Sequence, residues 1–152
     1  MPVEPSSFRE ALAHWASGIT AVTVPDGSGY WGMTASAFAS VSLDPPLIMV
    51  AIANSARTLA LIQKYHQFGV NLLAADQESA SRIFSSSDPK LPAELNSLVL
   101  PGALAHLQCQ VWQIYPGGDH QIVVGAVQEA RVLSDSTPLI YWHRNYRALK
   151  TD

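Results

Sequence analysis

The sequence predicts a mainly β protein of the α+β class, in which antiparallel strands form a barrel with a few short helices. Apolar and β-branched runs of strand length recur from residue 19 to residue 141, tight-turn signals separate most of them, and helical crossovers are few. Strands that follow one another through tight turns pair antiparallel, which favours a barrel over a doubly wound parallel sheet. The 152 residues suit one domain spanning residues 1–152.

The chain opens with a predicted helix. Ser7 is a candidate N-cap, and Glu10 completes a capping-box pattern with it. Phe8, Leu12 and Trp15 then fall on one helical face. Gly18 stands where such a helix would end.

Strand patterns follow the helix. The predicted strands of this half cover residues 19–24, 30–34, 38–43 and 47–53, with a strong turn signal at residues 25–29 and a break at residues 44–46. The first two strands are expected to form a hairpin. The run at residues 47–53 is apolar throughout, which predicts a strand buried on both faces.

The second half adds two helices and further strands. A cap at residues 54–58 predicts a helix that reaches Tyr65, and Asp76 is a candidate cap for a helix that reaches Phe84. The remaining strands are expected at residues 68–73, 103–115, 120–133 and 139–141. Residues 85–101, rich in serine and proline, form the least ordered segment by pattern.

Composition excludes several classes of protein. Hydrophobic residues make up 48% of the chain and charged residues 14%, which supports a real core and leaves apolar surface for a partner subunit. The net charge of −3 and the lack of a basic stripe argue against nucleic acid. No apolar run has the length of a membrane span, and the N-terminus lacks a signal-peptide pattern, so the chain is expected to be cytoplasmic.

The common chemical motifs do not occur in the sequence. It contains no G-x-G-x-x-G, no P-loop and no G-x-S-x-G. The five histidines are scattered and Cys109 is the single cysteine, so neither a metal site nor a disulfide is expected, and Cys109 is predicted to be a buried strand residue. By themselves, these patterns predict a soluble all-β domain with a cluster of polar loops and no particular activity.

One segment has unusual chemistry, namely G-M-T-A-S-A-F-A-S-V-S-L-D-P-P-L from residue 32 to residue 47. Thr34, Ser36, Ser40 and Ser42 are spaced to share one face of an extended strand. Small side chains admit a flat ligand, and hydroxyl and N–H groups supply donors of the kind that the pyrimidine edge of a flavin requires. Composition alone favours a Thr/Ser-rich edge strand with one wet face, so both interpretations stay open at this point.

That segment resembles the signature of the flavin reductase-like family, the FMN-binding split-barrel reductases of two-component monooxygenases. The resemblance covers nearly the whole chain. Further matching motifs occur in the family's order: F-R-E-A-L (residues 8–12), A-S-G-I-T-A-V-T (16–23), N-S-A-R-T (54–58), F-G-V-N-L-L (68–73), Gln77, Cys109, G-D-H (118–120), G-A-V (125–127) and P-L-I-Y (138–141).

The resemblance implies a site that binds a flavin, either FMN or FAD. The flavin ring and ribityl chain would lie against Thr34, Ala35, Ser36 and Ala37, and the same wall would continue through Ser40, Val41 and Ser42. The flavin phosphate would meet Ser55, Arg57 and Thr58, which agrees with the preference of anions for helix N-termini. The alternatives are an ordinary N-cap for Ser55 and a solvated charge for Arg57.

The resemblance also implies a nicotinamide site for NADH or NADPH. His120 would position or polarise the nicotinamide, the alternative being a turn histidine without a role. Phe84 and Tyr146 would cover the flavin or nicotinamide, or else pack in the core. Ala37 stands where many relatives have serine, and residues 85–101 lack a frequent aromatic residue, so substrate preference is open.

The implied function is that of an NAD(P)H:flavin oxidoreductase, a homodimer that supplies reduced flavin to a partner monooxygenase. One alternative is a flavin-binding electron-transfer protein that a protein partner reduces, without nicotinamide oxidation. Another is a dimeric barrel that binds a different flat ligand, such as haem.

Overall fold

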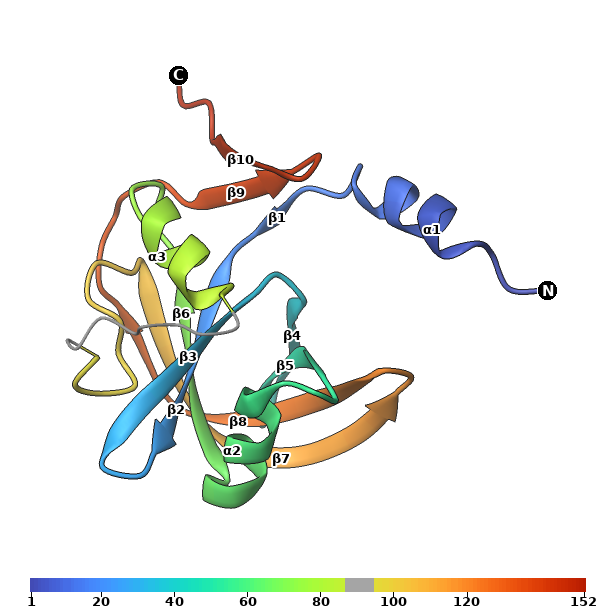
Figure 1. Ribbon diagram of the computed structural model, residues 1–152. Coiled ribbons are helices and arrows are strands. Elements are labelled where there is room, and N and C mark those ends of the chain that lie inside the picture. Colours follow the sequence, from blue (N-terminus) through green and yellow to red (C-terminus); the bar gives the residue numbers. More distant parts are fainter. Residues whose placement is uncertain (87–94) are drawn as a thin grey trace.

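The computed structural model describes residues 1–86 and 95–152 of the chain, and in these parts the fold is an antiparallel split β-barrel with three short helices (Figure 1). The elements are α1 (Pro5–Leu12), β1 (Ser17–Gly18), β2 (Thr20–Asp26), β3 (Gly29–Ala35), β4 (Phe38–Leu43), β5 (Pro46–Ala53), α2 (Arg57–Tyr65), β6 (Gln67–Leu72), α3 (Glu78–Phe84), β7 (Ala105–Gly117), β8 (His120–Val132), β9 (Leu139–Trp142) and β10 (Asn145–Ala148). The predicted fold class is confirmed.

Seven strands form the barrel sheet in the order β3-β2-β6-β7-β8-β5-β4, and all neighbours are antiparallel. Its two edges, β3 and β4, are consecutive in the chain and are joined by Ser36 and Ala37 alone. The sheet must therefore curl until its edges approach. At the seam the N–H of Ala51 donates to the carbonyl of Ala37 at 3.0 Å.

A smaller sheet, β1-β9-β10, lies at one end of the barrel, with α3 beside it (Figure 1). Helix α2 packs mainly on β2, with further contacts to β3 and β5, and α3 packs on β3 and β2. Helix α1 projects away from the barrel, and none of its eight residues is buried. None of the helices in the described parts of the chain has the length and apolar character that crossing a bilayer requires.

Alternating side chains of the barrel strands build the core, as the period of a strand requires. In β2 and β6 the buried residues include Val22, Val24, Phe68 and Val70. Cys109 of β7 is fully buried among them, as predicted. Burial raises the pKa of this thiol to about 12, so it stays protonated and unreactive near neutral pH.

A buried polar network ties the segment after residue 95 to the outside of β2, β6 and β7. The side chain of Asn71 is fully buried, and its Nδ2 donates to the carbonyls of Ala21 and Leu98, both at 3.1 Å. Its Oδ1 accepts from the N–H of Leu100 at 2.9 Å and from Nδ1 of His106 at 2.9 Å. The network satisfies backbone groups that this non-strand segment would otherwise bury unpaired.

His106 gives the fold a predicted pH dependence. Burial lowers the pKa of this fully buried side chain, Arg131 lowers it further, and Glu129 acts in the opposite direction. Below the ordinary value of 6.5 the unfolded chain therefore binds a proton that the folded chain does not. We expect stability to fall as the pH drops from 6.5 towards the lowered pKa, and to gain nothing from His106 above 6.5.

Urea denaturation at pH 7.5 and at pH 5.5 measures this effect in the parent protein, in His106→Gln and in a control at the exposed His14, His14→Gln. The His106 variant should lose less stability between the two pH values than the parent and the control. An equal loss in all three proteins would contradict the assignment.

Several local predictions at helix ends were wrong. Helix α1 begins at Pro5 with Glu4 as N-cap and no side-chain cap, so Ser7 does not cap it, and the helix ends before Trp15. Proline suits the first turn of a helix because its ring fixes φ and no N–H is needed there. Ala56 and Gln77 are the N-caps of α2 and α3, again without side-chain caps. The N-cap alternative for Ser55 and the cap at Asp76 are therefore wrong.

Two strand predictions also need correction. The hydroxyls of residues 34–42 do not share one strand, because Thr34 belongs to β3, Ser36 lies in the seam, and Ser40 and Ser42 belong to β4 with a register shift between them. Strand β5 is not buried on both faces along its length, since Met49, Ala51 and Ala53 are only half-buried in the single chain. The short strands β1 and β10 were not predicted. Part of the predicted loop at residues 85–101 lies outside the described residues.

Candidate functional site

A pocket of about 640 Å³ opens between β3, the start of α2 and the end of α3. Its described lining consists of Trp31, Gly32, Met33 and Thr34 from β3, Ser55, Ala56, Arg57 and Thr58 from the start of α2, and Phe84, Ser85 and Ser86 from the end of α3. Five of the predicted site residues therefore come together here: Thr34, Ser55, Arg57, Thr58 and Phe84.

One wall of the pocket is the edge strand β3. Among the described strands β3 has one neighbour in its sheet, β2, so the N–H and C=O groups on its other edge are open to a ligand. Gly32 lets this wall lie against Phe84, because a Cβ on Gly32 would stand 2.5 Å from Cε1 of the ring. Phe84 is only 2% exposed, which supports the core-packing alternative for this residue while its ring also lines the pocket.

The opposite wall is the N-terminus of α2. Its N-cap residue, Ala56, has an extended backbone and supplies no side-chain acceptor to the first turn. The first N–H groups of a helix lack partners within the helix, and they favour an anion. Ser55 and Arg57 are exposed beside this turn, whereas Thr58 is buried. A phosphate at this end of the pocket would meet hydroxyl, guanidinium and N–H donors together.

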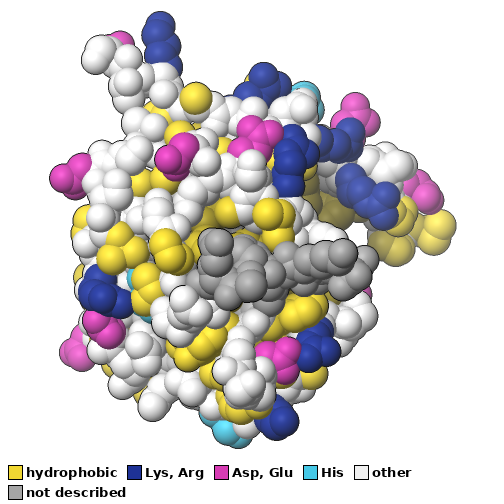
Figure 2. Space-filling view, turned by 60° about the vertical axis from the view of Figure 1, so that its left-hand side comes forward, with side chains coloured by type: hydrophobic (Ala, Val, Ile, Leu, Met, Phe, Trp, Pro, Cys, Tyr) yellow, Lys and Arg dark blue, Asp and Glu magenta, His cyan; other side chains and the backbone are white. Residues whose placement is uncertain are grey.

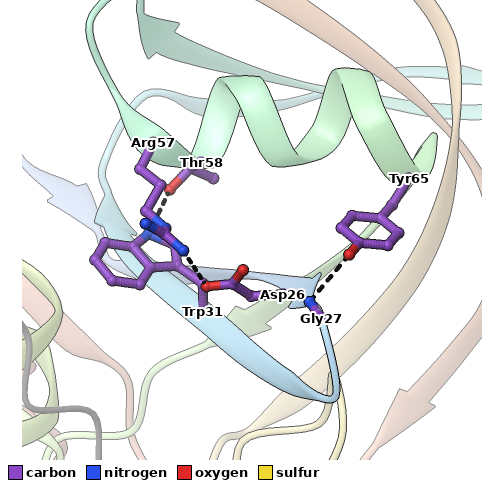
Figure 3. Close-up of polar contacts among 6 residues, drawn as sticks. All are labelled: Asp26, Gly27, Trp31, Arg57, Thr58 and Tyr65. Carbon is purple, nitrogen blue, oxygen red and sulfur yellow. Dashed lines mark hydrogen bonds and ion pairs between the residues drawn. The ribbon is translucent and has the colours of Figure 1, made fainter.

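Arg57 is held by a cluster of side chains from the β2–β3 hairpin (Figure 3). Its Nη2 lies 2.6 Å from Oδ2 of Asp26, and its Cζ lies 5.0 Å from the centre of the Trp31 ring. Nε1 of Trp31 donates to Oγ1 of Thr58 at 3.2 Å. At the far end of α2 the hydroxyl of Tyr65 accepts from the N–H of the turn residue Gly27 at 2.9 Å. These contacts fix α2 and the hairpin relative to each other.

Tyr146 lines a smaller pocket of about 190 Å³ that shares Thr34 and Ser85 with the larger one. Oγ1 of Thr34 donates to the carbonyl of Ser81 at 2.6 Å, and Oγ of Ser81 lies 2.8 Å from the hydroxyl of Tyr146. The predicted residue Ser36 lines the same small pocket. This pocket therefore extends the polar wall of β3 towards the small sheet.

The other predicted residues of the first flavin wall lie elsewhere in the single chain. Ala35 is buried at the end of β3, and Ala37 is exposed in the seam. Ser40, Val41 and Ser42 belong to β4, at the other edge of the barrel sheet, and do not line either pocket. The structure of one chain does not bring these residues to Arg57.

His120 begins β8, at the tip of the β7–β8 hairpin, and lines neither pocket. Its Nδ1 lies 2.6 Å from Oδ1 of Asp119, and this hydrogen bond lowers the pKa of Asp119. Asn54 fixes the hairpin tip by donating to the carbonyl of Gly118 at 3.2 Å and accepting from Gln121 at 3.0 Å. Because Asn54 immediately precedes Ser55, the hairpin of His120 adjoins the α2 wall of the larger pocket.

Among other residues of the site, sequence reasoning missed Trp31, which lines the pocket, and Asp26, which holds Arg57. Asp26 was assigned to a turn signal and Trp31 to a strand, since neither is near Arg57 in the sequence. The signal for this contact is tertiary, because it depends on the packing of α2 against β2 and β3. In the parts of the chain that the structure describes, no three His, Cys, Asp or Glu side chains gather as a metal site would require.

The pocket fits a flat molecule with an anionic tail. Its volume lies within the usual range of small-ligand sites, and it joins an open strand edge to a helix N-terminus with a guanidinium. A flavin mononucleotide has this arrangement of an extended ring with donors and acceptors on one edge and a phosphate at the other end. The fold and site thus define a split-barrel protein with a place for a nucleotide-like cofactor.

Comparisons with known proteins agree. Residues 12–150 match the family model described as the flavin reductase like domain. The chain is 43% identical to the reductase component of 4-hydroxyphenylacetate 3-monooxygenase from Thermus thermophilus, over 94% of this chain and 95% of that one. It is 38% identical to an NADH-dependent flavin reductase from a Rhodococcus species, over 97% and 88% of the two chains.

A solved structure is also similar. The NADH:FAD oxidoreductase of Streptomyces globisporus, solved in complex with NAD and FAD fragments, superposes with a TM-score of 0.88 at 31% identity, covering 100% of this chain and 98% of that one. The chain belongs to the flavin reductase-like family, as the sequence motifs predicted.

Proposed function

We propose that this protein is an NAD(P)H:flavin oxidoreductase that reduces FMN or FAD and supplies the reduced flavin to a partner monooxygenase. The observation that carries this proposal is the pocket in which the open edge of β3 faces the N-terminus of α2 with Arg57. The similar proteins support it, since they include an NADH-dependent flavin reductase and a monooxygenase reductase component.

The residues of the pocket would act by binding and orienting the flavin. When bound, the flavin supplies the chemistry by accepting hydride from the nicotinamide and passing electrons onward. The open edge of β3 would donate N–H groups to the pyrimidine side of the ring, where reduction adds negative charge. Ser55, Arg57 and Thr58 would hold the phosphate, and the Thr34 hydroxyl, bonded to the carbonyl of Ser81, would fix the position of the β3 wall.

We propose that His120 positions the nicotinamide. In support, the hairpin that carries it is tied to Asn54, next to the α2 wall, and Nδ1 of His120 contacts Asp119. Hydride transfer depends on stacking and distance, so loss of a positioning group lowers the rate. In His120→Asn we expect the rate constant for reduction of bound flavin by NADH to fall about tenfold with flavin affinity unchanged. Stopped-flow reduction of bound flavin measures the first quantity and fluorescence titration the second. A variant with the parent's reduction rate would exclude this role.

Steady-state kinetics with the four pairs of FMN or FAD and NADH or NADPH test the proposed activity. We expect the protein to oxidise NADH, NADPH or both at a rate well above that measured without protein. The rates with the four pairs then show which nicotinamide and which flavin are preferred. If the purified protein binds flavin yet oxidises neither nicotinamide, it is a flavin-binding electron-transfer protein instead. If it neither binds flavin nor oxidises nicotinamide, the proposed function is wrong.

We further propose that the chain forms one flavin reductase-like domain and functions as a homodimer. Helix α1 projects from the barrel with the side chains of Phe8 and Leu12 each 54% exposed, and Trp15 beside it is 76% exposed. Hydrophobic side chains also reach the surface on the face shown in Figure 2. Apolar exposure of this kind favours a second copy. Sedimentation equilibrium should give twice the mass of one chain. A measured mass equal to that of one chain would contradict the dimer. Cytoplasmic location stays a prediction.

A further inference from the structure

Arg57, the proposed phosphate ligand, is already paired with a carboxylate. Its Nη2 lies 2.6 Å from Oδ2 of Asp26, the last residue of β2. The side chain of Asp26 is 29% exposed against 56% for Arg57, so the carboxylate is the better shielded partner. The contact joins residues 31 positions apart in the chain, and the packing of α2 on β2 maintains it (Figure 3).

An anion that binds Arg57 therefore meets two charges of opposite sign. The guanidinium has five N–H donors, and one carboxylate oxygen occupies only some of them. The remaining donors can bind a second acceptor. The nearby carboxylate repels the incoming anion, and this repulsion grows in proportion to the charge of the anion. The Trp31 ring, 5.0 Å from Cζ of Arg57, covers one face of the guanidinium and limits screening by water there.

We propose that Asp26 is a specificity-determining residue of the flavin site, which weakens binding most for a flavin that ends in a phosphate monoester. The inference rests on the flavin site proposed above. A phosphate monoester, as in FMN, carries roughly −1.5 to −2 charges near pH 7. In FAD the same phosphate is part of a pyrophosphate and carries one charge, while the second charge lies on the adjoining phosphate, one P–O–P bridge further from Arg57, and riboflavin has no phosphate. The penalty from Asp26 therefore decreases from FMN to FAD and vanishes for riboflavin.

This ranking has a consequence for the reaction. A site that hands reduced flavin to another protein must release it, and a carboxylate beside the phosphate ligand weakens the hold on the flavin without altering the ring's surroundings. Asp26 thereby favours a flavin that exchanges with solution over one that stays bound, and it lowers the affinity for FMN more than the affinity for FAD.

Asp26→Asn tests the inference, because asparagine keeps the shape and an oxygen acceptor for Arg57 but removes the charge. In titrations of flavin fluorescence at low ionic strength, we expect the affinity for FMN to rise about tenfold, that for FAD about threefold, and that for riboflavin by less than about twofold. Asp26→Ser, which also removes the charge, should give the same ranking and serves if the first variant does not fold.

Glu129→Gln is the matched control. It removes the same charge from an exposed pair on β8, where Nε of Arg131 lies 2.9 Å from Oε1 of Glu129, and should leave all three affinities unchanged. Equal changes for the three flavins in the Asp26 variants, no change, or weaker FMN binding would each overturn the inference while leaving the proposed function intact. A parent protein that binds none of the three flavins would overturn both.

Discussion

Replacing Asn71 with alanine is expected to destabilise the protein by about 3–4 kcal/mol, the largest loss of stability that we predict for a single substitution. The amide side chain is fully buried near the end of β6 and hydrogen-bonds five partners, including Oγ1 of Thr23. Alanine leaves the N–H of Leu100 and the carbonyls of Ala21 and Leu98 buried without this partner. Unpaired buried groups are costly, and the cavity left by the amide adds to the loss.

Urea denaturation followed by circular dichroism measures this effect. The matched control is Asn145→Ala, since Asn145 is exposed and its Nδ2 donates to one carbonyl, that of His143 at 3.1 Å. We expect the control to lose less than about 1 kcal/mol. A loss in Asn71→Ala no larger than in the control would show that the network does not hold the segment after residue 95 to the barrel.

Replacing Arg57 with alanine is expected to lower the affinity for FMN by about 10–100-fold, because hydrogen bonds from a charged donor to phosphate contribute about 1.5–3 kcal/mol each. Riboflavin should bind the variant nearly as well as the parent, since it lacks the phosphate. The FMN affinity of Arg57→Lys should lie between that of the parent and that of Arg57→Ala, because an ammonium keeps the charge but loses the planar fork. Both Arg57 substitutions are thus expected to weaken FMN binding, whereas Asp26→Asn is expected to strengthen it.

Fluorescence titration with FMN and riboflavin checks this prediction. Arg131→Ala on β8 is the control, because Arg131 is exposed and paired with an acid, as Arg57 is, but does not line the pocket. Equal losses of FMN and riboflavin affinity would mean that Arg57 supports the fold of the pocket and does not bind phosphate.

The barrel could be predicted from the sequence because local signals and tertiary structure agree in it. The turn at residues 25–29 sets the β2–β3 hairpin, and the predicted strand at residues 38–43 coincides with β4. Pairing across the closed sheet could not be predicted in this way. The antiparallel pairing of β5 with β8, residue 51 opposite residue 122, depends on closure of the barrel. The two-residue strand β1 forms only because β9 is beside it.

The candidate site was predictable only in part, for the same reason. Thr34 and the segment from Ser55 to Thr58 carry motifs that can be recognised locally, and the structure brings them to one pocket. The hydroxyls of β4 fit the same motif, yet the break at the seam directs β3 and β4 to opposite edges of the sheet. Asp26 carries no motif, and its contact with Arg57 exists only once α2 has packed on β2.

A crystal structure of the protein with bound FMN tests the central claim most directly. We predict that the ring lies along the open edge of β3, with the phosphate within hydrogen-bonding distance of Ser55, Arg57 and the first N–H groups of α2. FMN bound outside this pocket, for example in the apolar cavity lined by Trp15, Phe38 and Leu139, would contradict the proposed site.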